Sequence, residues 1–281
     1  MNARNILAGL MLAAGSLSTE AQEWKLVWSE EFDRPGKVDE AVWNYEEGFV
    51  RNHEDQWYQR DNAWCEDGCL VIEARREATA RPNPRYDSHS ERWPQRVKDI
   101  RYTSASINTR GKMEFLYGRV EVRAKIPTGA GAWPAIWLLG TGMDWPSCGE
   151  IDMMEYYRKQ GVPHILANAC WGTDRQWVAQ WDSEAVPYSH FTDRDAAWGE
   201  KFHIWRMDWN EESIRLYLDD ELLNEIPQAE AVNGSLGHGT QPFTRPMYLL
   251  LNLALGGDNG GPLSDDQLPM TYLVDYVRVY Q

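Results

Sequence analysis

The 281-residue sequence has few basic residues, few cysteines and no long apolar run beyond its N-terminus. Lys and Arg together number 28 against 43 Asp and Glu, so the formal net charge is −15. Nucleic acids bind to basic surfaces, and we therefore expect no nucleic-acid partner. Strong acidity also repels anionic polymers at long range, which favours a neutral ligand. We also expect no membrane span, because a transmembrane helix needs a long apolar stretch.

The four cysteines are Cys65, Cys69, Cys148 and Cys170, and no His stands at a spacing from them that suits a zinc site. An even number is typical of exported proteins with disulfides. A hairpin turn near residues 158–162 would place position 150 roughly opposite position 170, so that Cys148 and Cys170 become neighbours. A Cys148–Cys170 disulfide, a Cys65–Cys69 disulfide and buried free thiols are all compatible with the sequence.

Residues 1–21 have the pattern of a signal peptide. Arg4 is followed by a short apolar run over residues 6–14, and small residues precede Ala21. The apolar run is too short to cross a bilayer. We therefore expect export to the periplasm or the extracellular space, and a mature chain that begins near residue 22.

Aromatic residues with a polar atom are abundant, with 15 Trp and 13 Tyr against only 6 Phe. Such side chains suit surfaces that combine apolar contact with hydrogen bonding, as sugar-binding grooves do. The alternative is that a large β core uses Trp for packing, since Trp is highly buried on average.

Short strand-like runs separated by turn residues fill the chain from Trp24 onward. Residues 118–126 and 274–280 alternate apolar and polar side chains, which is typical of strands with one face exposed to water. No amphipathic helix exceeds two turns, and no repeat or linker divides the chain. We therefore predict an all-β sandwich or jelly roll that forms one domain over residues 22–281. We predict a long surface loop over residues 78–99, which lack periodicity.

Three acids stand close together in residues 149–157, a run that otherwise resembles a strand. Glu150 and Asp152 share one face of a regular strand, whereas Glu155 would point to the opposite face among Ile151 and Met153. Burial of a carboxylate among apolar side chains is costly. A β-bulge near Met153 and Met154 would return Glu155 to the face of the other two acids, and we predict one there.

Most glycoside hydrolases use two carboxyl groups that flank the glycosidic bond to be cleaved. With a bulge between them, Glu150 and Glu155 are offset by about four strand positions, or roughly 13 Å between Cα atoms. Their side chains can lean together to the ~5–5.5 Å typical of retaining enzymes. Asp152 between them can hold the nucleophile and shift its pKa. From these residues alone, the alternative is a solvated acidic edge.

The acidic run resembles the signature of glycoside hydrolase family 16 in its longer, bulged form. The likeness extends in the right order over essentially all of the mature chain. The other segments that resemble this family are residues 26–33, residues 54–58 with Asn52 before them, residues 117–123, residues 133–139 and residues 274–280.

The resemblance implies a concanavalin-like β-jelly roll of two curved antiparallel sheets, with substrate across the concave face. It implies that Glu150 is the nucleophile, Asp152 the assisting acid and Glu155 the general acid/base, and that catalysis needs no cofactor. It also implies a structural calcium, for which Glu31 and Asp275 are the candidate ligands. The expected sugar-binding residues, some of them identified also by their aromatic character, are Asn52, Glu54, Trp133, Trp137, Trp145 and Trp171.

The resemblance further implies a secreted, monomeric, retaining endo-β-glucanase that acts on β-1,3- or mixed β-1,3/1,4-glucan, a neutral polysaccharide. One alternative is an agar- or porphyran-type endo-β-galactanase, for which Arg51, Arg60 or Arg175 would have to supply a basic pocket. The other alternative is a non-catalytic β-glucan-binding lectin. A lectin would tolerate the loss of the three acids, whereas this sequence keeps all of them.

Overall fold

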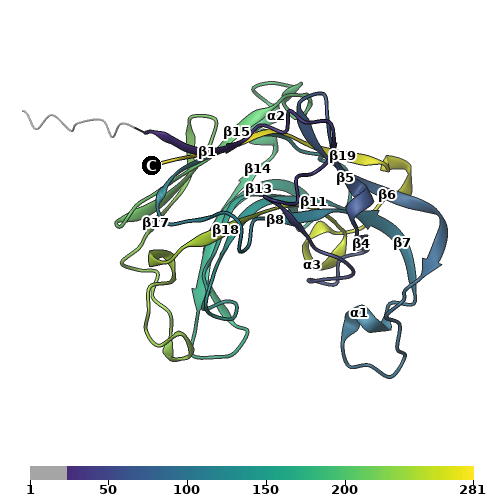
Figure 1. The fold of residues 1–281 in the computed structure, drawn as a ribbon, viewed down its shortest axis with the longest axis horizontal. Helices are drawn as coiled ribbons and strands as arrows, with labels where there is room; N and C mark the ends of the chain where they lie inside the picture. The colour runs from purple at the N-terminus through teal and green to yellow at the C-terminus, as the bar shows by residue number, and fades with distance from the viewer. Residues whose placement is uncertain (1–23) are drawn as a thin grey trace, which may run out of the picture.

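The structure is a computed structural model that describes residues 24–281, and two β-sheets stacked face to face make up most of it (Figure 1). The predicted all-β jelly roll is thereby confirmed. The signal peptide predicted for residues 1–21 lies outside the described residues. All strand pairs are antiparallel except β4 with β7.

The outer sheet has the strand order β17-β16-β15-β10-β19-β6-β5-β2, with β1 beside β19, β7 beside β6 and β4 beside β7. Its strands are β1 (Leu26–Glu30), β2 (Gly36–Lys37), β4 (Gln56–Tyr58), β5 (Ala63–Glu66), β6 (Cys69–Pro82), β7 (Asp99–Ser104), β10 (Gly118–Lys125), β15 (His203–Trp209), β16 (Ser213–Leu218), β17 (Glu221–Pro227) and β19 (Met270–Tyr280).

The inner, concave sheet has the order β14-β13-β12-β11-β18-β8-β3, with β9 beside β18. Its strands are β3 (Asn44–Tyr45), β8 (Ser106–Asn108), β9 (Glu114–Phe115), β11 (Ala132–Gly140), β12 (Glu150–Lys159), β13 (Val162–Gly172), β14 (Ala179–Pro187) and β18 (Met247–Leu255).

Helices in the described part of the chain are single turns, and none has the length or apolar character to cross a membrane. They are α1 (Trp93–Arg96), α2 (Ser189–Thr192), α3 (Gly257–Gly260) and the 3₁₀ turns η1 (Arg60–Asn62), η2 (Trp198–Glu200), η3 (Ser235–Gly237), η4 (Pro242–Thr244) and η5 (Asp265–Gln267).

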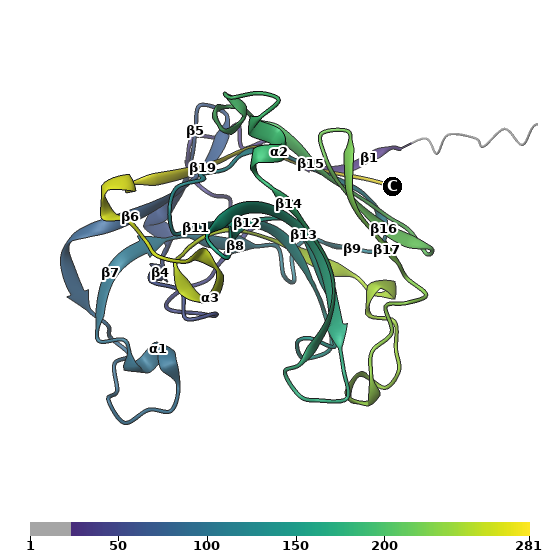
Figure 2. The ribbon, with the colours of Figure 1, turned by 180° about the vertical axis from the view of Figure 1, so that it is seen from behind.

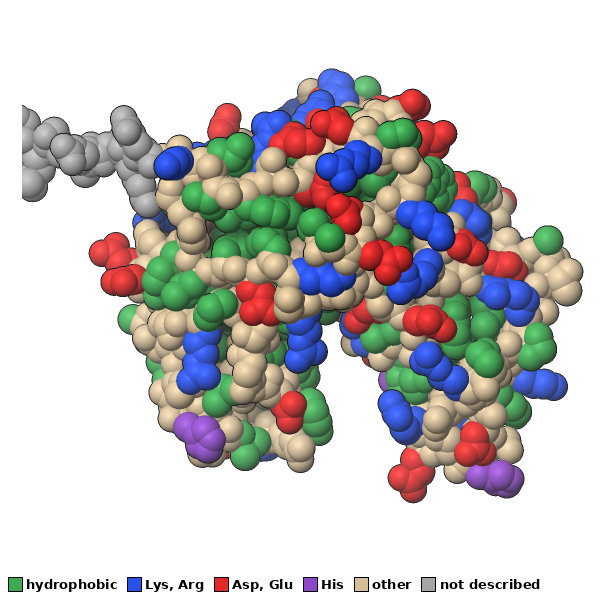
Figure 3. Space-filling view, viewed as in Figure 1, with side chains coloured by type: hydrophobic (Ala, Val, Ile, Leu, Met, Phe, Trp, Pro, Cys, Tyr) green, Lys and Arg blue, Asp and Glu red, His purple; other side chains and the backbone are tan. Residues whose placement is uncertain are grey.

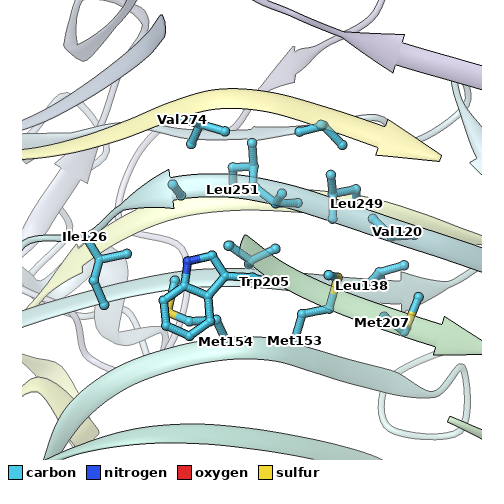
Figure 4. Packing of buried hydrophobic residues seen from close by; sticks show 14 of the residues in the cluster. Val120, Ile126, Leu138, Met153, Met154, Trp205, Met207, Leu249, Leu251 and Val274 are labelled. Carbon is cyan, nitrogen blue, oxygen red and sulfur yellow. The ribbon is translucent and has the colours of Figure 1, made fainter. Parts of the chain in front are cut away.

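Sequence patterns explain how the two sheets pack. In β10, Val120, Val122 and Ala124 are fully buried, while the charged residues between them are half-exposed, as a strand with one wet face requires. In β11 and β18, nearly every residue is buried, because one face meets the outer sheet and the other lies beneath cleft-lining side chains. Figure 4 shows the interdigitated core between the sheets, with Trp205 among its largest side chains.

The predicted bulge is present in β12. On β11, the neighbours Ile136 and Trp137 pair with Met154 and Asp152, so that Met153 is one extra residue, and the register with β13 shifts at the same place. Met153 and Met154 are both fully buried and both point into the core (Figure 4). The bulge therefore turns two consecutive side chains inward and returns the following residue to the cleft face.

The β12–β13 hairpin also agrees with its prediction. β12 ends at Lys159 and β13 begins at Val162, and Glu150 pairs with Cys170. All four cysteines are free thiols in the structure, so neither candidate disulfide forms.

The predicted surface loop over residues 78–99 is partly wrong, because β6 continues to Pro82 and β7 begins at Asp99. Residues 83–98 between them form an ordered lobe around α1. The buried Asn83 donates from Nδ2 to the carbonyls of Pro94 (2.9 Å) and Val97 (2.7 Å), and Trp93 packs on the rings of Phe49 and His53. These contacts explain why a segment without periodicity has a defined shape.

The inner sheet arches over a hollow that two lobes enclose (Figures 1 and 2). Residues 83–98 form one lobe. The other is formed by the loop from β13 to β14 and the segment from β17 to β18. Figure 3 shows the open space between the lobes on the concave side.

The bulge yields a stability test. Since both methionines are buried, Met153→Ala and Met154→Ala should each lower the free energy of unfolding by about 2–5 kcal/mol, as large-to-small core substitutions do. In a regular strand one of the two would face the cleft and cost much less. Val162→Ala in the same hairpin, at a position 51% exposed, is the control and should change stability by less than about 0.5 kcal/mol. Chemical denaturation measures all three, and a large cost at only one methionine contradicts the bulge.

Candidate active site

A cleft of about 640 Å³ crosses the concave face of the inner sheet. The strands β14, β13, β12, β11 and β18, which are adjacent in this order, all contribute side chains to it. The cleft therefore runs across the strands rather than along them. It contains all three acids of the β12 run together with Trp133, Trp137 and Trp145.

Glu150, Asp152 and Glu155 form one row on the cleft floor, as the bulge predicts. Glu150 lies opposite Leu139 and Glu155 opposite Ala135, so the two are offset by four positions of β11. This offset corresponds to roughly 13 Å between Cα atoms. Asp152 is only 2% exposed, whereas both Glu side chains are partly open to the cleft.

Each Glu of the row accepts a hydrogen bond from an indole. Trp145 Nε1 donates to Glu150 Oε2 (2.9 Å), and Trp133 Nε1 donates to Glu155 Oε1 (2.8 Å). Asn168 on β13 donates from Nδ2 to Glu155 Oε2 (3.0 Å) and to Asp152 Oδ2 (3.3 Å). The indoles are donors only, so they fix the carboxylate orientations without competing for protons.

Burial and mutual repulsion set the protonation of the row. Burial, with the charge of Glu155, raises the pKa of Glu150 to about 7. Burial also raises the pKa of Glu155 to about 7, against the hydrogen bonds from Trp133 and Asn168. Burial and the two neighbouring charges hold the pKa of Asp152 well above its usual range, so Asp152 keeps a proton that it can donate to Glu150. Near neutral pH the row therefore contains both protonated and ionised carboxyl groups.

The walls of the cleft offer aromatic faces and both neutral and ionisable hydrogen-bonding groups. Trp137 donates from Nε1 to Asn252 Oδ1 (2.7 Å), and the Arg51 guanidinium lies 5.1 Å from its ring centroid. Glu54, which is 3% exposed, accepts from Gln56 Nε2 (2.7 Å), and Asn52 lines the cleft beside it. Pyranose rings have apolar faces and polar edges, and this combination of groups matches both.

A family model described as "Glycosyl hydrolases family 16" matches residues 50–277. The chain belongs to glycoside hydrolase family 16. It is 35% identical to a beta-glucanase from Rhodothermus marinus over an aligned length of 295, and the match covers 99% of this chain and 92% of the relative. It is 32% identical to glucan endo-1,3-beta-glucosidase A1 from Niallia circulans, where the match spans 91% of this chain but 38% of the longer relative.

Solved structures of family 16 proteins share the fold. The laminarinase catalytic domain from Thermotoga maritima superposes with a TM-score of 0.74 at 33% identity, covering 92% of this chain and 99% of that one. A structure from work on endo-acting O-glycanases that human gut microbiota express to initiate mucin breakdown has a TM-score of 0.79 at 35% identity. That match covers 92% of this chain and 91% of the other. The protein is thus a family 16 hydrolase with the family's fold.

One residue expected to bind sugar in this family 16 cleft does not lie there. Trp171 is 7% exposed, belongs to the core between the sheets and packs edge-on against Phe243. Asn168 lines the cleft from the same strand, and the odd offset of three positions puts Trp171 on the opposite face. The expectation for Trp171 is therefore wrong, while those for Trp133, Trp137 and Trp145 agree with the positions of these residues.

The two expected calcium ligands are both paired with arginines in this family 16 chain. Arg278 donates to both carboxylate oxygens of Glu31 (3.0 and 2.8 Å), and Asp275 is ion-paired with Arg123. Calcium takes six to eight oxygen ligands, which can be carboxylates, carbonyls or waters. Residues 24–281 contain no group of three His, Cys, Asp or Glu arranged to hold a metal ion. The structural calcium at these two acids stays a prediction.

Several cleft residues were missed in the sequence. Tyr157, Asn168, Trp181 and Asn252 all line the cleft, on β12, β13, β14 and β18. Strand parity would have found Tyr157, since it lies two positions after Glu155. The register of the predicted hairpin would have found Asn168, which pairs with Asp152. For Trp181 and Asn252, the sequence carries no signal of which strands lie beside β12 and β11.

The raised pKa of Glu155 predicts a pH-dependent cost in stability. Because the folded-state pKa of about 7 lies above the ordinary value of 4.5, the folded protein binds the extra proton. The stability that this proton contributes to the folded state is fully present below about pH 4.5 and is lost as the pH rises through about 7. From pH 5 to pH 8, the free energy of unfolding of Glu155→Gln should rise by about 1–3 kcal/mol relative to that of the unmodified protein, because only the unmodified protein loses this contribution. Ser183→Ala, an uncharged change in the same cleft, should gain nothing over this range. Denaturant unfolding at both pH values measures the difference, and parallel curves for Glu155→Gln contradict it.

Proposed function

We propose that the protein is an exported, retaining endo-β-glucanase that hydrolyses β-1,3- or mixed β-1,3/1,4-glucan. The observation that carries the proposal is the row in the cleft, where Glu150 and Glu155 stand four positions apart and each accepts an indole hydrogen bond. Two carboxyl groups so placed suit a double displacement. Relatives from Rhodothermus marinus, Niallia circulans and Cryptopygus antarcticus are named for activity on β-glucans.

In the first step of the proposed reaction, a Glu150 oxygen attacks the anomeric carbon and forms an ester bond. The glycosidic bond breaks, and its electron pair stays on the departing oxygen, which takes the proton of Glu155. In the second step, Glu155 accepts a proton from water, whose oxygen attacks the same carbon and releases Glu150. Asp152 holds Glu150 through its hydrogen bond, and burial raises the pKa of Glu155 to about 7, so that a protonated fraction is available near neutral pH.

Cleavage within the chain agrees with the shape of the cleft. The cleft crosses five adjacent strands of the inner sheet, from β18 to β14, and the space between the two lobes is open (Figure 3). A long chain can lie across the strands with sugar units on both sides of the acids. Such a polymer does not enter cells, and this supports export together with the predicted signal peptide at residues 1–21.

Charge placement favours a neutral glucan over a sulfated galactan. One relative, from Sphingobacterium multivorum, is named a keratan-sulfate endo-1,4-beta-galactosidase. A sulfate site would need converging cations, but Arg51 is ion-paired with Glu46, and Arg60 with Glu40. Arg51 lines the cleft, Arg175 lines a separate hollow, and Arg60 lines neither. The three arginines that a galactanase would have to use are therefore dispersed.

The activity test compares wild type with variants of the two Glu residues. Glu150→Gln should reduce the hydrolysis of laminarin and barley β-glucan by roughly 10³- to 10⁶-fold, because the nucleophile is lost. Glu155→Gln should reduce it by roughly 10²- to 10⁴-fold, as the removal of a general acid does. Glu211→Gln, in the turn between β15 and β16, keeps full activity as a control. Reducing-end assays give these rates. A wild type that binds these glucans but releases no reducing ends is a lectin instead, and one that cleaves only agarose or porphyran is a galactanase.

Stereochemistry tests the double displacement separately. Two successive inversions at one carbon give net retention, so the first product should be the β-anomer. Proton NMR during the first minutes of hydrolysis distinguishes the two anomers before mutarotation mixes them. Initial α-anomer is incompatible with a covalent Glu150 intermediate.

A further inference from the structure

A second hollow, of about 500 Å³, lies beside the catalytic cleft. The loops that line it are residues 142–147, just before β12, residues 172–177, just after β13, and residues 236–238. We call it the side pocket. Since these loops lie off the ends of the strands, the side pocket is displaced along the strand direction, whereas the cleft runs across the strands. A group in the side pocket would thus project sideways from a chain in the cleft.

Trp145 connects the two spaces, because it lines both of them. Its Nε1 donates to Glu150 in the cleft, while part of the same residue forms a wall of the side pocket. No other residue lines both spaces. A ligand bound in the side pocket against Trp145 therefore contacts a residue that also orients an acid of the catalytic row.

The lining of the side pocket suits an uncharged sugar. Trp177 is 58% exposed, an unusual position for so large an apolar surface. Gln176 and His238 add hydrogen-bonding groups, and the charges of Asp144 and Arg175 are opposite. Two indoles with polar groups at the edges are the features by which proteins bind pyranose rings.

The side pocket is held in shape by a buried residue. Asn233, 3% exposed, accepts from the Gly172 N–H at Oδ1 (2.7 Å) and donates from Nδ2 to the Ser147 carbonyl (2.9 Å). It thereby joins all three loops. Gly172 is needed at this junction, because a Cβ there would lie 2.3 Å from Ser147 Oγ. A preformed pocket loses little conformational entropy on binding.

We propose that the side pocket binds a single neutral glycosyl branch of the polysaccharide whose backbone lies in the cleft. In a β-1,3-linked glucan, the hydroxyl on the exocyclic carbon is free and reaches furthest from the backbone, so a branch there extends sideways. The assignment rests on the proposed β-glucanase function. It makes the protein selective for branched over linear chains of the same backbone.

The experiment uses two β-1,3-glucan oligosaccharides of equal backbone length, one of them with a single β-1,6-linked glucosyl branch. Wild type should cleave the branched one with a kcat/KM about three- to tenfold higher, the factor expected for one added aromatic contact. Trp177→Ala should abolish this preference while the rate on the linear substrate changes less than about twofold. Trp177 is exposed, so the variant should fold as wild type does, which thermal melting checks.

Two comparison variants separate a branch site from general effects. Trp181→Ala, which removes an indole from the main cleft, should lower the rates on both substrates by similar factors. Leu222→Ala, at a site on β17 that is 46% exposed, should behave as wild type. If wild type cleaves both substrates equally and Trp177→Ala changes nothing, the branch site is wrong and the β-glucanase function stands. If wild type cleaves neither, the function itself is wrong, and the branch assignment falls with it.

Discussion

One extra residue in β12 is the constraint on which the active site depends. Two sheets that share a core require alternate residues of each strand to face inward. In a row of acids on such a strand, a spacing of five residues would send one acid into the core. The bulge at Met153 and Met154 resolves this conflict, because both methionines enter the core and Glu155 returns to the cleft. Packing and catalytic geometry are thus set by the same irregularity.

The burial that makes the acids reactive also opposes folding. A carboxylate in a partly dry cleft loses hydration, and three acids in one row repel each other. The structure offsets part of this cost with Trp133, Trp145 and Asn168, each of which donates to the row. The cost of ionising the acids that these bonds do not offset raises the pKa values of the row. One carboxyl group can therefore give a proton while another attacks. The large core elsewhere in the two sheets makes this local cost tolerable.

Much of the fold and the catalytic row could be predicted from the sequence, because both depend on local periodicity. The bulge could be predicted because Glu155 would face the core in a regular strand. The resemblance to family 16 assigned the roles of Glu150, Asp152 and Glu155. Trp171 was misplaced although the predicted hairpin already put Cys170 opposite Glu150, because strand parity then turns Trp171 to the core face. The lobe at residues 83–98 has no periodicity, since its shape comes from contacts with distant residues such as Phe49. The arginine partners of Glu31 and Asp275 come from neighbouring strands, so the sequence around these two acids could not reveal them.

The hydrogen bond between Trp145 and Glu150 gives the protein an optical property. In the proposed reaction Glu150 is an anion in the free enzyme and an uncharged ester in the intermediate. The charge-assisted bond from the indole weakens when that charge disappears. Indole fluorescence responds to the polarity and hydrogen bonding around the ring, so the emission of Trp145 reports the formation and decay of the covalent intermediate. The indole that orients the nucleophile is thus also placed to sense its charge, as one of the 15 Trp of the chain.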